Sequence, residues 1–397
     1  MNFCKKSENA LFFSSINEIP NTIWDDLDCA ENNYFSKKFL ASVEKNHSQI
    51  NFIYIVLVDD KKQPKAFASI QIVDFYLNSV DNKFENFTSK LKTVARKLHI
   101  FPDKKPLKLL ICGNTFVSGE HGIFIKQNND KKIVIKELAK AILHFVTADK
   151  NLKIDAFLLK DFINESLFIA DELKDYNYNP FSVEPNMVLY IAKNWRNFDD
   201  YLAAMKTKFR VKAKKAIQLS ATLQIENVTL ENIDIQLPKM TELYKKVATN
   251  AAFNLGDFNL ATYKDFKEKL GENYILKTYW LQDKMVGFMS GIINQNSLDA
   301  HFVGIDYQLN REFAIYQKML YDYIEIAIDK NLKTINFGRT ASEIKSSVGA
   351  EPQDLTMYLR HKKSITNKIL KLFLQRVQPT PFHQHFPFKT LNPHEKQ

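Results

Sequence analysis

The residues best suited to chemistry lie in the segment INFGRTASEIKSS, residues 335–347. Gly338 ends an apolar run, and Arg339, Glu343 and Lys345 follow it closely. A carboxylate such as Glu343 can take a proton from an attacking amine. Cations such as Arg339 and Lys345 can hold a phosphate or carboxylate group. The segment predicts a site with Glu343 as catalytic base and Gly338, Arg339 and Lys345 at the substrate, although an internal ion pair that only orders the turn would fit the same pattern.

A second group of polar residues precedes this motif at the end of an expected strand. Asp306 lies near the carboxyl end of that strand and is the second candidate for the catalytic base. His301 is five residues earlier, so on a regular strand the two side chains point to opposite faces unless a bulge intervenes. His301 is more typical of a structural histidine.

A basic run lies within a helix expected over residues 195–220. Six cations fall within ten residues, and of these Arg210, Lys212 and Lys215 are the candidate substrate-binding residues. The planar guanidinium of Arg210 is well suited to phosphate. Such a run can hold a phosphorylated acceptor, a tRNA acceptor stem or an anionic lipid head group. A solvated helix face is the alternative.

The loop CGNTFVSGEHG, residues 112–122, contains three of the ten glycines of the chain. Scarce glycine in one loop indicates unusual backbone angles or the close approach of a ligand. Asn114 and His121 are the side chains that this loop would present to a substrate. A tight structural loop is the alternative, and no metal site is expected here.

Composition limits the remaining choices. The formal net charge of the 397 residues is +10, and the three cysteines form neither a disulfide framework nor a metal pattern. The start of the chain does not resemble a signal peptide, and no apolar run reaches the length that crosses a bilayer. We expect a cytoplasmic protein. No nucleophile elbow, phosphate-binding loop or zinc spacing is found, so hydrolase, kinase and metalloenzyme functions are disfavoured.

The order of elements predicts an α/β fold with mixed sheets. A hairpin is expected at 51–58 and 65–77, a helix at 84–98, and a strand–helix–strand–helix–strand series over 107–192. After further helices and a three-stranded meander at 273–306, the same series recurs over 298–360. Predicted domains are 1–185 and 186–361, followed by a basic amphipathic tail at 362–397.

The tail begins as an expected helix with an apolar face. Its members are Ile365, Ile369, Leu372, Phe373 and Val377. Lysines flank this face, which is typical of an interfacial membrane anchor. A helix packed on the body of the protein is the alternative.

Four segments give the chain a resemblance to a known family. They are the loop 112–122, the helix WRNFDDYLAAMKTKFRVKAKKA, the unit HFVGIDYQLNREFAIYQKMLYDYIEIAI, and INFGRTASEIKSSVGAEP. Over roughly residues 34–360 the chain resembles FemAB-like proteins with two tandem GNAT-like (acyl-CoA N-acyltransferase) domains. The resemblance implies transfer of an acyl or aminoacyl group to an amine, from acyl-CoA or aminoacyl-tRNA, without a metal.

One departure from the GNAT pattern lies at residues 310–316. A typical GNAT enzyme has a glycine-rich turn there, whose N–H groups bind the pyrophosphate of CoA. This chain reads NREFAIY, without glycine, and Glu312 would bring an anion to the phosphate. The departure favours FemAB-like chemistry over plain GNAT chemistry.

The sequence therefore predicts an acyl- or aminoacyltransferase. Its acceptor would be a small-molecule or lipid-linked amine, such as a cell-envelope precursor, with tRNA and the inner face of the membrane as further partners and no DNA. A non-catalytic GNAT pair that binds an anionic lipid or RNA is the first alternative. Acetyl-CoA-dependent acylation of a small metabolite is the second.

Overall fold

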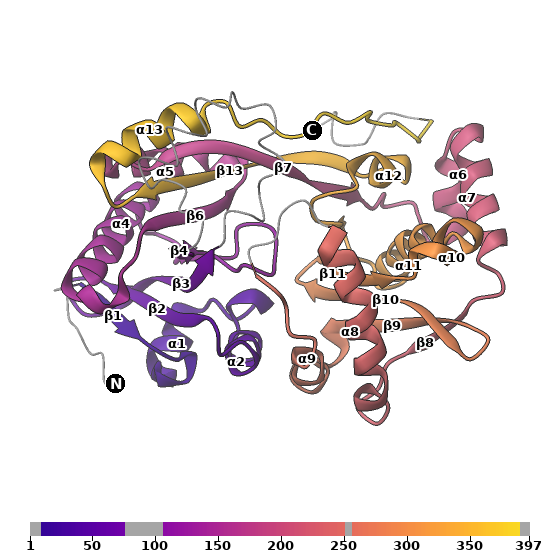
Figure 1. The fold of residues 1–397 in the computed structure, drawn as a ribbon, viewed down its shortest axis with the longest axis horizontal. Helices are drawn as coiled ribbons and strands as arrows, with labels where there is room; N and C mark the ends of the chain where they lie inside the picture. The colour runs from indigo at the N-terminus through magenta and orange to yellow at the C-terminus, as the bar shows by residue number, and fades with distance from the viewer. Residues whose placement is uncertain (1–8, 76–105, 251–255, 390–397) are drawn as a thin grey trace. The chain divides into compact units, whose positions relative to one another are not determined.

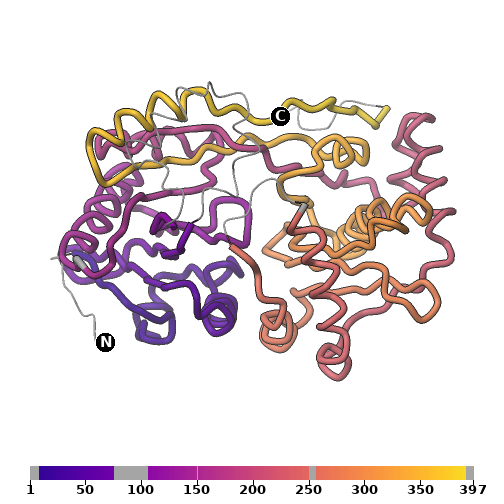
Figure 2. The backbone as a smooth tube through the Cα atoms, in the orientation of Figure 1, coloured from indigo at the N-terminus to yellow at the C-terminus, as the bar shows by residue number. Residues whose placement is uncertain are grey.

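The protein consists of two compact units whose segments alternate along the chain (Figures 1 and 2). The structure, a computed structural model, describes residues 9–75, 106–250 and 256–389. Unit 1 comprises Met1–Glu184, Ala252–Asn259 and Asp354–Pro379, and unit 2 comprises Pro185–Ala251, Leu260–Gln353 and Thr380–Gln397. The units are therefore not consecutive segments, and the expected tail is divided between them. The helix expected at 84–98 lies outside the described residues.

Unit 1 has a mixed sheet with strand order β1-β2-β3-β4-β6-β13, and β5 pairs with β3. Its strands and helices, including the two strands that it shares with unit 2, are β1 (Ala10–Phe13), α1 (Asn21–Leu27), α2 (Lys37–Asn46), β2 (Asn51–Val58), β3 (Pro64–Phe75), β4 (Leu107–Cys112), β5 (Ile123–Ile125), α4 (Lys131–Ala148), β6 (Ala156–Phe162), α5 (Leu167–Ala170), β7 (Asn179–Tyr190), β13 (Glu351–His361) and α13 (Ser364–Leu374).

Helices cover both faces of this sheet because its central strands are apolar on both sides. Ile53, Ile55 and Leu57 of β2 join the hydrophobic cluster that contains the buried side of α4. On the opposite face the ring of Trp24, from α1, contacts the ring of Phe67 on β3 at 5.0 Å. Figure 1 shows α1 and α2 on one side of the unit 1 strands and α4 on the other.

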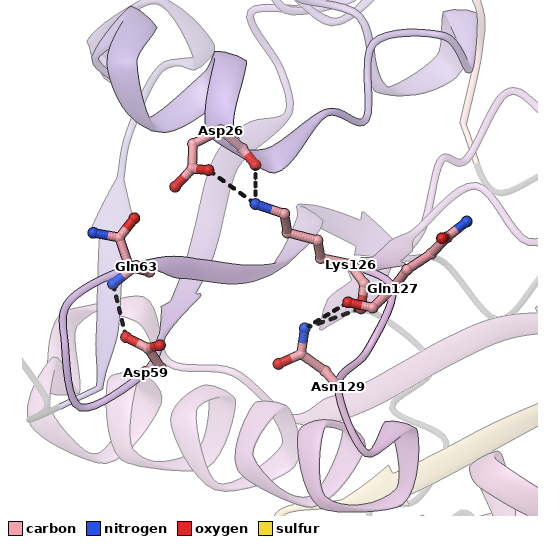
Figure 3. Close-up of polar contacts among 6 residues, drawn as sticks. All are labelled: Asp26, Asp59, Gln63, Lys126, Gln127 and Asn129. Carbon is pink, nitrogen blue, oxygen red and sulfur yellow. Dashed lines mark hydrogen bonds and ion pairs between the residues drawn. The ribbon is translucent and has the colours of Figure 1, made fainter.

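Polar contacts connect α1 to the segment that follows β5 (Figure 3). The Lys126 ammonium donates to the carbonyl oxygen of Asp26 at 2.5 Å and pairs with its carboxylate at 2.9 Å. Asn129 donates to the Lys126 carbonyl at 3.0 Å, and the Gln63 N–H donates to the Asp59 carboxylate at 2.8 Å within the β2–β3 turn. These contacts hold the loops beside α1 and α4 in place.

The part of the mixed sheet that lies in unit 2 has strand order β7-β12-β11-β10-β9-β8. The other elements of unit 2 are α6 (Phe198–Ala204), α7 (Thr207–Leu219), β8 (Gln224–Asn227), α8 (Ile233–Asn250), α9 (Thr262–Leu270), β9 (Tyr274–Leu281), β10 (Lys284–Asn294), β11 (Ser297–Ile305), α10 (Tyr307–Phe313), α11 (Ile315–Asp329), β12 (Thr334–Asn336) and α12 (Ser342–Ser347).

Two helical layers enclose this sheet as well. The buried sides of α7 and α11, among them Ala213 and Met319, pack with Val286 of β10 in one cluster. On the other face the ring of Tyr263 from α9 lies 6.1 Å from that of Phe288 on β10. Each unit is therefore a sheet between two layers of helices.

The repeated order expected from the sequence is present in both halves of the chain. The series β4–α4–β6–α5–β7 corresponds to β11–α11–β12–α12–β13. In each series the first two strands are parallel, with Leu109 opposite Ala156 and Ser297 opposite Thr334. The last strand then leaves its own series: β13 pairs with β6 in unit 1, and β7 pairs with β12 in unit 2. Each sheet is completed by the final strand of the other repeat.

Three expected helices are interrupted. The helix expected over 195–220 is broken at Met205, which is extended and forms a bridge with Phe388, while Lys206 N–H bonds the Pro387 carbonyl at 2.7 Å. The helix expected after β11 is split into α10 and α11 at Ala314, which has a φ of 48°. The helix expected at 163–174 is a series of short helical turns.

Candidate active site

The strand β11 contains the bulge on which the positions of His301 and Asp306 depend. Met289 on β10 lies opposite Val303, but Gly291 lies opposite Ala300, so His301 and Phe302 together face Ser290 alone. The Ser290 hydroxyl accepts from the Phe302 N–H at 3.1 Å and donates to the Phe302 carbonyl at 2.8 Å. The bulge shifts the alternation by one residue, so strand parity no longer separates the two side chains.

Each of these side chains has its own structural contacts. The ring of His301 lies against Phe302, with ring centres 4.3 Å apart, and beside Tyr263 and Phe266 of α9. The Asp306 carboxylate caps α10 by accepting from the Gln308 N–H at 3.1 Å, and pairs with Lys284 at 2.8 Å, which lowers the pKa of Asp306. Asp306 therefore stabilises the β11–α10 junction, whereas His301 packs between β11 and α9.

The turn after β12 has an unusual backbone. Gly338, Thr340 and Ala341 all have positive φ, at 69°, 64° and 49°. Such angles cost free energy in non-glycine residues and persist only where other contacts hold them. Lys345 supplies such contacts, because its Nζ donates to the carbonyl oxygens of Gly338 at 3.2 Å and Arg339 at 2.7 Å.

Lys345 is buried, with 4% of its surface exposed. Burial lowers its pKa to about 7, because a cation loses hydration inside the protein. Burial also lowers the pKa of the half-buried Arg339 to about 10, so this guanidinium stays charged at neutral pH. The structure thus places Lys345 inside the turn, and Glu343 is exposed on the opposite side of α12.

A pocket of about 500 Å³ lies within unit 2. It is bordered by α7, the first turns of α11, α12, and the C-terminal segment of unit 2 that contains Phe382 and His385. Its lining residues are Phe209, Lys212, Gln317, Tyr321, Ala341, Ser342, Glu343, Ile344, Ser347, Phe382 and His385. Of the residues singled out in the sequence, it brings together Glu343 and Lys212.

A carboxylate, an imidazole and an ammonium group border this pocket. Glu343 Oε1 lies 3.5 Å from His385 Nε2, and Lys212 comes from α7. The His385 ring packs edge-on against Phe209, with ring centres 5.7 Å apart, and its backbone N–H donates to the Ser346 hydroxyl at 3.0 Å. A carboxylate beside an imidazole can orient the ring, and such pairs occur in general acid–base catalysis.

His385 is held by a well-anchored strap, which we define as residues 382–389. Lys389 N–H donates to the Ala204 carbonyl at 3.1 Å, next to the contacts that interrupt the helix at Met205. The ring of Phe388 packs on Trp195 at 5.2 Å and lies over Gly349, where a Cβ atom would approach it to 2.3 Å. Because the strap is fixed at its far end, His385 has a defined position at the pocket.

No sequence pattern selects His385, because no third potential metal ligand accompanies His383 and His385 in the C-terminal segment. The usable signal was the aromatic composition of HQHFPF, since phenylalanines in a terminal segment indicate that the segment packs on the protein. Its partners, Trp195 and Gly349, are remote in sequence.

The other cations of α7 lie outside this pocket. Arg210 is half-buried, and Lys215 is exposed and does not line it. Within the described residues, no carboxylate forms an ion pair with any of the five cations of α7. These are Lys208, Arg210, Lys212, Lys214 and Lys215.

Asn114 and His121 belong to unit 1, in a closed loop. The buried Lys160 donates to the carbonyl oxygens of Asn114 at 2.9 Å and Val117 at 2.7 Å, and pairs with Asp161 at 2.5 Å. His121 is half-buried, with its ring centre 4.0 Å from that of Tyr34, and desolvation together with the charge of Lys160 lowers its pKa to about 3. The loop is held by unit 1 itself, in agreement with its alternative interpretation as a structural loop.

The start of α11 has no glycine but is capped by a side chain. Asn310 Oδ1 accepts from the Tyr316 N–H at 2.9 Å, and Glu312 is exposed beside it. This side-chain carbonyl occupies one of the N–H groups that would otherwise be available to a phosphate at a helix N-terminus. Among the described residues, no group of three potential metal ligands occurs, and no helix is both long and apolar enough to cross a membrane.

Comparisons with known proteins agree with this architecture. The family model of FemAB-like proteins, described as peptidoglycan biosynthesis/recognition, matches residues 111–395. The solved structure titled "Crystal structure of FemX" is 12% identical, with a TM-score of 0.50, and the match covers 85% of this chain and 93% of that one. No curated protein matches the sequence significantly.

A second similar structure is a tandem GNAT protein from the clavulanic acid biosynthesis pathway. It is 8% identical, with a TM-score of 0.53, and the match covers 89% of this chain and 98% of that one. At such identities these structures show the fold, and the predicted pair of GNAT-like domains is confirmed. The family match supports an acyl- or aminoacyltransferase of cell-envelope biosynthesis. It covers well over half of the residues, so this chain belongs to the FemAB-like family.

Proposed function

We propose that this chain transfers an acyl or aminoacyl group to the amine of a cell-envelope precursor, with the pocket of unit 2 as its active site. The observation that carries the proposal is the gathering of Glu343, His385 and Lys212 around one pocket. These are a carboxylate, an imidazole and a cation, groups that can accept a proton from an amine and hold an anionic donor. Family membership supports the reaction class.

In the proposed reaction, the amine nitrogen attacks the carbonyl carbon of an ester or thioester donor. A C–N bond forms, the C–O or C–S bond breaks, and the alcohol or thiol leaves with a proton. The imidazole of His385, oriented by Glu343, accepts the proton that the amine loses. Holding the two reactants together supplies most of the remaining acceleration.

Lys212 would contact the anionic part of the donor. Both donor classes, acyl-CoA and aminoacyl-tRNA, carry phosphate groups, and an ammonium beside the pocket attracts them. The free cations of α7 extend this positive charge away from the pocket, which suits the longer backbone of tRNA. The side-chain cap on α11 also favours aminoacyl-tRNA, because it occupies an N–H that CoA pyrophosphate would use.

The proposal is tested by donor consumption. The purified chain is incubated with acetyl-CoA, a long-chain acyl-CoA or tRNA charged with radiolabelled amino acids, together with an extract of amine-containing peptidoglycan precursors. We expect one donor to be consumed and its label to appear in the precursor. Glu343→Gln and His385→Asn should each lower kcat by about 10²–10⁴-fold with little change in binding.

The control variant is Glu325→Gln, which removes an exposed carboxylate of α11 that does not line the pocket. Its kcat should equal that of the unmodified protein. Lys212→Gln should raise KM for the donor more than Lys214→Gln on the same helix, because Lys212 lines the pocket and Lys214 does not. Equal activity in Glu343→Gln, His385→Asn and the control would overturn the assignment of this pocket.

The second candidate is a binding module without catalysis. The bond from Tyr316 to Asn310 favours it, because it closes part of the position at which GNAT enzymes hold their donor. Failure of all three donors to react, combined with a saturable rise in the thermal midpoint on adding the precursor extract, would establish this alternative.

A further inference from the structure

The helix α13 in unit 1 faces the protein with its less apolar side. Its buried residues are Thr366, Asn367, Leu370 and Leu374. Asn367 anchors the helix, since its side-chain oxygen accepts from the His361 N–H at 2.8 Å and its amide donates to the Asn177 carbonyl at 2.8 Å. Polar contacts therefore help to set the orientation of α13 on unit 1.

The apolar stripe of the same helix faces outward. Ile365 is 73% exposed and Leu372 is 63% exposed. They are seven residues apart, which places them two turns from each other on one face. Ile369 and Phe373 are half-buried along the same stripe, and Val377 is half-buried just beyond the end of the helix. The alternative considered for the tail, a helix that only packs on the body of the protein, would bury this stripe.

Positive charge surrounds the exposed stripe. Lys363, Lys368, Lys371 and Arg376 are exposed, and none forms an ion pair with a described residue. The chain has no Asp or Glu between Asp354 and Glu395. A surface that combines two exposed aliphatic side chains with unpaired cations complements a surface that is anionic outside and apolar just beneath.

We propose that the outward face of α13, residues 365–376, lies on the surface of an anionic phospholipid bilayer. Ile365 and Leu372 would enter the boundary between head groups and acyl chains, while the lysines extend their ammonium groups to lipid phosphates. An RNA would use the cations but gain nothing from exposed Ile and Leu. This proposal does not rest on the transfer reaction.

The test is co-sedimentation of the full chain with vesicles. We expect binding to vesicles of phosphatidylglycerol and phosphatidylcholine, weakening as salt rises, and little binding to phosphatidylcholine alone. The double variant Ile365→Asp/Leu372→Asp should bind anionic vesicles at least about tenfold more weakly. Lys368→Glu/Lys371→Glu should also lose at least about tenfold, since each cation contributes about fivefold and reversal adds repulsion.

The matched control is Val211→Asp, which places the same change on an exposed apolar residue of the basic helix α7. Its vesicle binding should equal that of the unmodified chain. Both α13 variants should keep their thermal midpoint and their donor consumption with a water-soluble acceptor, so a loss of folding or of catalysis is distinguished from a loss of membrane contact.

Three results would overturn the proposal. One is vesicle binding that survives both α13 changes, and another is binding that is lost in Val211→Asp instead. The third is a lipid-free dimer of the unmodified chain that becomes monomeric in Ile365→Asp/Leu372→Asp, because a second copy would then cover this face.

Discussion

In the motif at 335–347, the surroundings of Glu343 and Lys345 give these two charged residues different roles, which the sequence alone does not reveal. Glu343 and Lys345 are two residues apart on a short helix, so they point in different directions. Glu343 reaches the pocket and His385, whereas Lys345 reaches back to the carbonyl oxygens of the turn. The motif was selected for its composition, but only one of its charged side chains borders the pocket.

Lys345 gives the protein a pH-dependent stability that can be measured. Its pKa of about 7 in the folded protein is below the ordinary value of 10.5. Between these values the unfolded chain binds a proton that the folded chain does not, so the free energy of unfolding rises with pH. Below pH 7 the buried amine is protonated in the folded protein, so the loss of stability caused by its burial is complete. Lys345→Met should remove up to about 1.4 kcal/mol per pH unit of this slope, measured by urea unfolding between pH 7 and 9.

The exposed Lys330 supplies the comparison, since Lys330→Met removes a lysine without removing a buried one. Its slope should match that of the unmodified chain. An unchanged slope in Lys345→Met would mean that this amine is charged in the folded protein.

Gly349 should be sensitive to a single methyl group. Its φ is 102°, and a Cβ would lie 2.3 Å from the Phe388 ring, so the strap that holds His385 would have to move. We expect Gly349→Ala to destabilise the fold by about 1–3 kcal/mol and to lower kcat. Gly271→Ala tests positive φ alone, because nothing lies within 4 Å of its Cβ position. It should lose stability only, and equal kcat values in both variants would refute the role of the strap.

At the scale of elements, the alternation of apolar residues predicted the strands and helices whose form depends only on nearby residues. The meander β9–β10–β11 was expected almost residue by residue, because alternating apolar residues and short polar turns define such strands. The break between α6 and α7 was not, since Met205 becomes extended only through its bridge to Phe388. The bulge in β11 was also hidden, because it depends on the Ser290 hydroxyl of the neighbouring strand.

Ser290 therefore deserves a direct test as the support of the bulge. It is fully buried and bonds both backbone groups of Phe302. Ser290→Ala leaves a buried N–H and carbonyl without this partner and should cost about 1–3 kcal/mol in thermal or urea unfolding. Thr147→Ala, which removes an exposed hydroxyl from α4, should change stability by far less.

At the scale of the whole molecule, the repeat was readable but the exchange of final strands was not. The sequence indicates that a strand follows each crossover helix, yet it does not say whose sheet that strand joins. β6 and β12 each acquire an antiparallel neighbour from the other half of the chain. The division into contiguous domains at 185/186 stays a prediction. The two compact units each consist of several segments that alternate along the chain.

This interleaving predicts that the halves do not fold alone. A fragment of residues 1–185 lacks the β13 strand beside β6 and should show little cooperative unfolding by circular dichroism. Co-expression with residues 186–397 should restore a cooperative transition. A well-folded isolated fragment would contradict the importance of the exchanged strand for unit 1.

The exchange also has a consequence for the nascent chain. The neighbour of Phe162 on β6 is Thr356, which emerges from the ribosome long after β6 has been made. During that interval β6 has an unpaired edge of buried, apolar residues, and such edges pair readily with other chains. Synthesis of this protein therefore has a vulnerable period that ends only when β13 is available, and chaperones that shield nascent strands should raise its soluble yield.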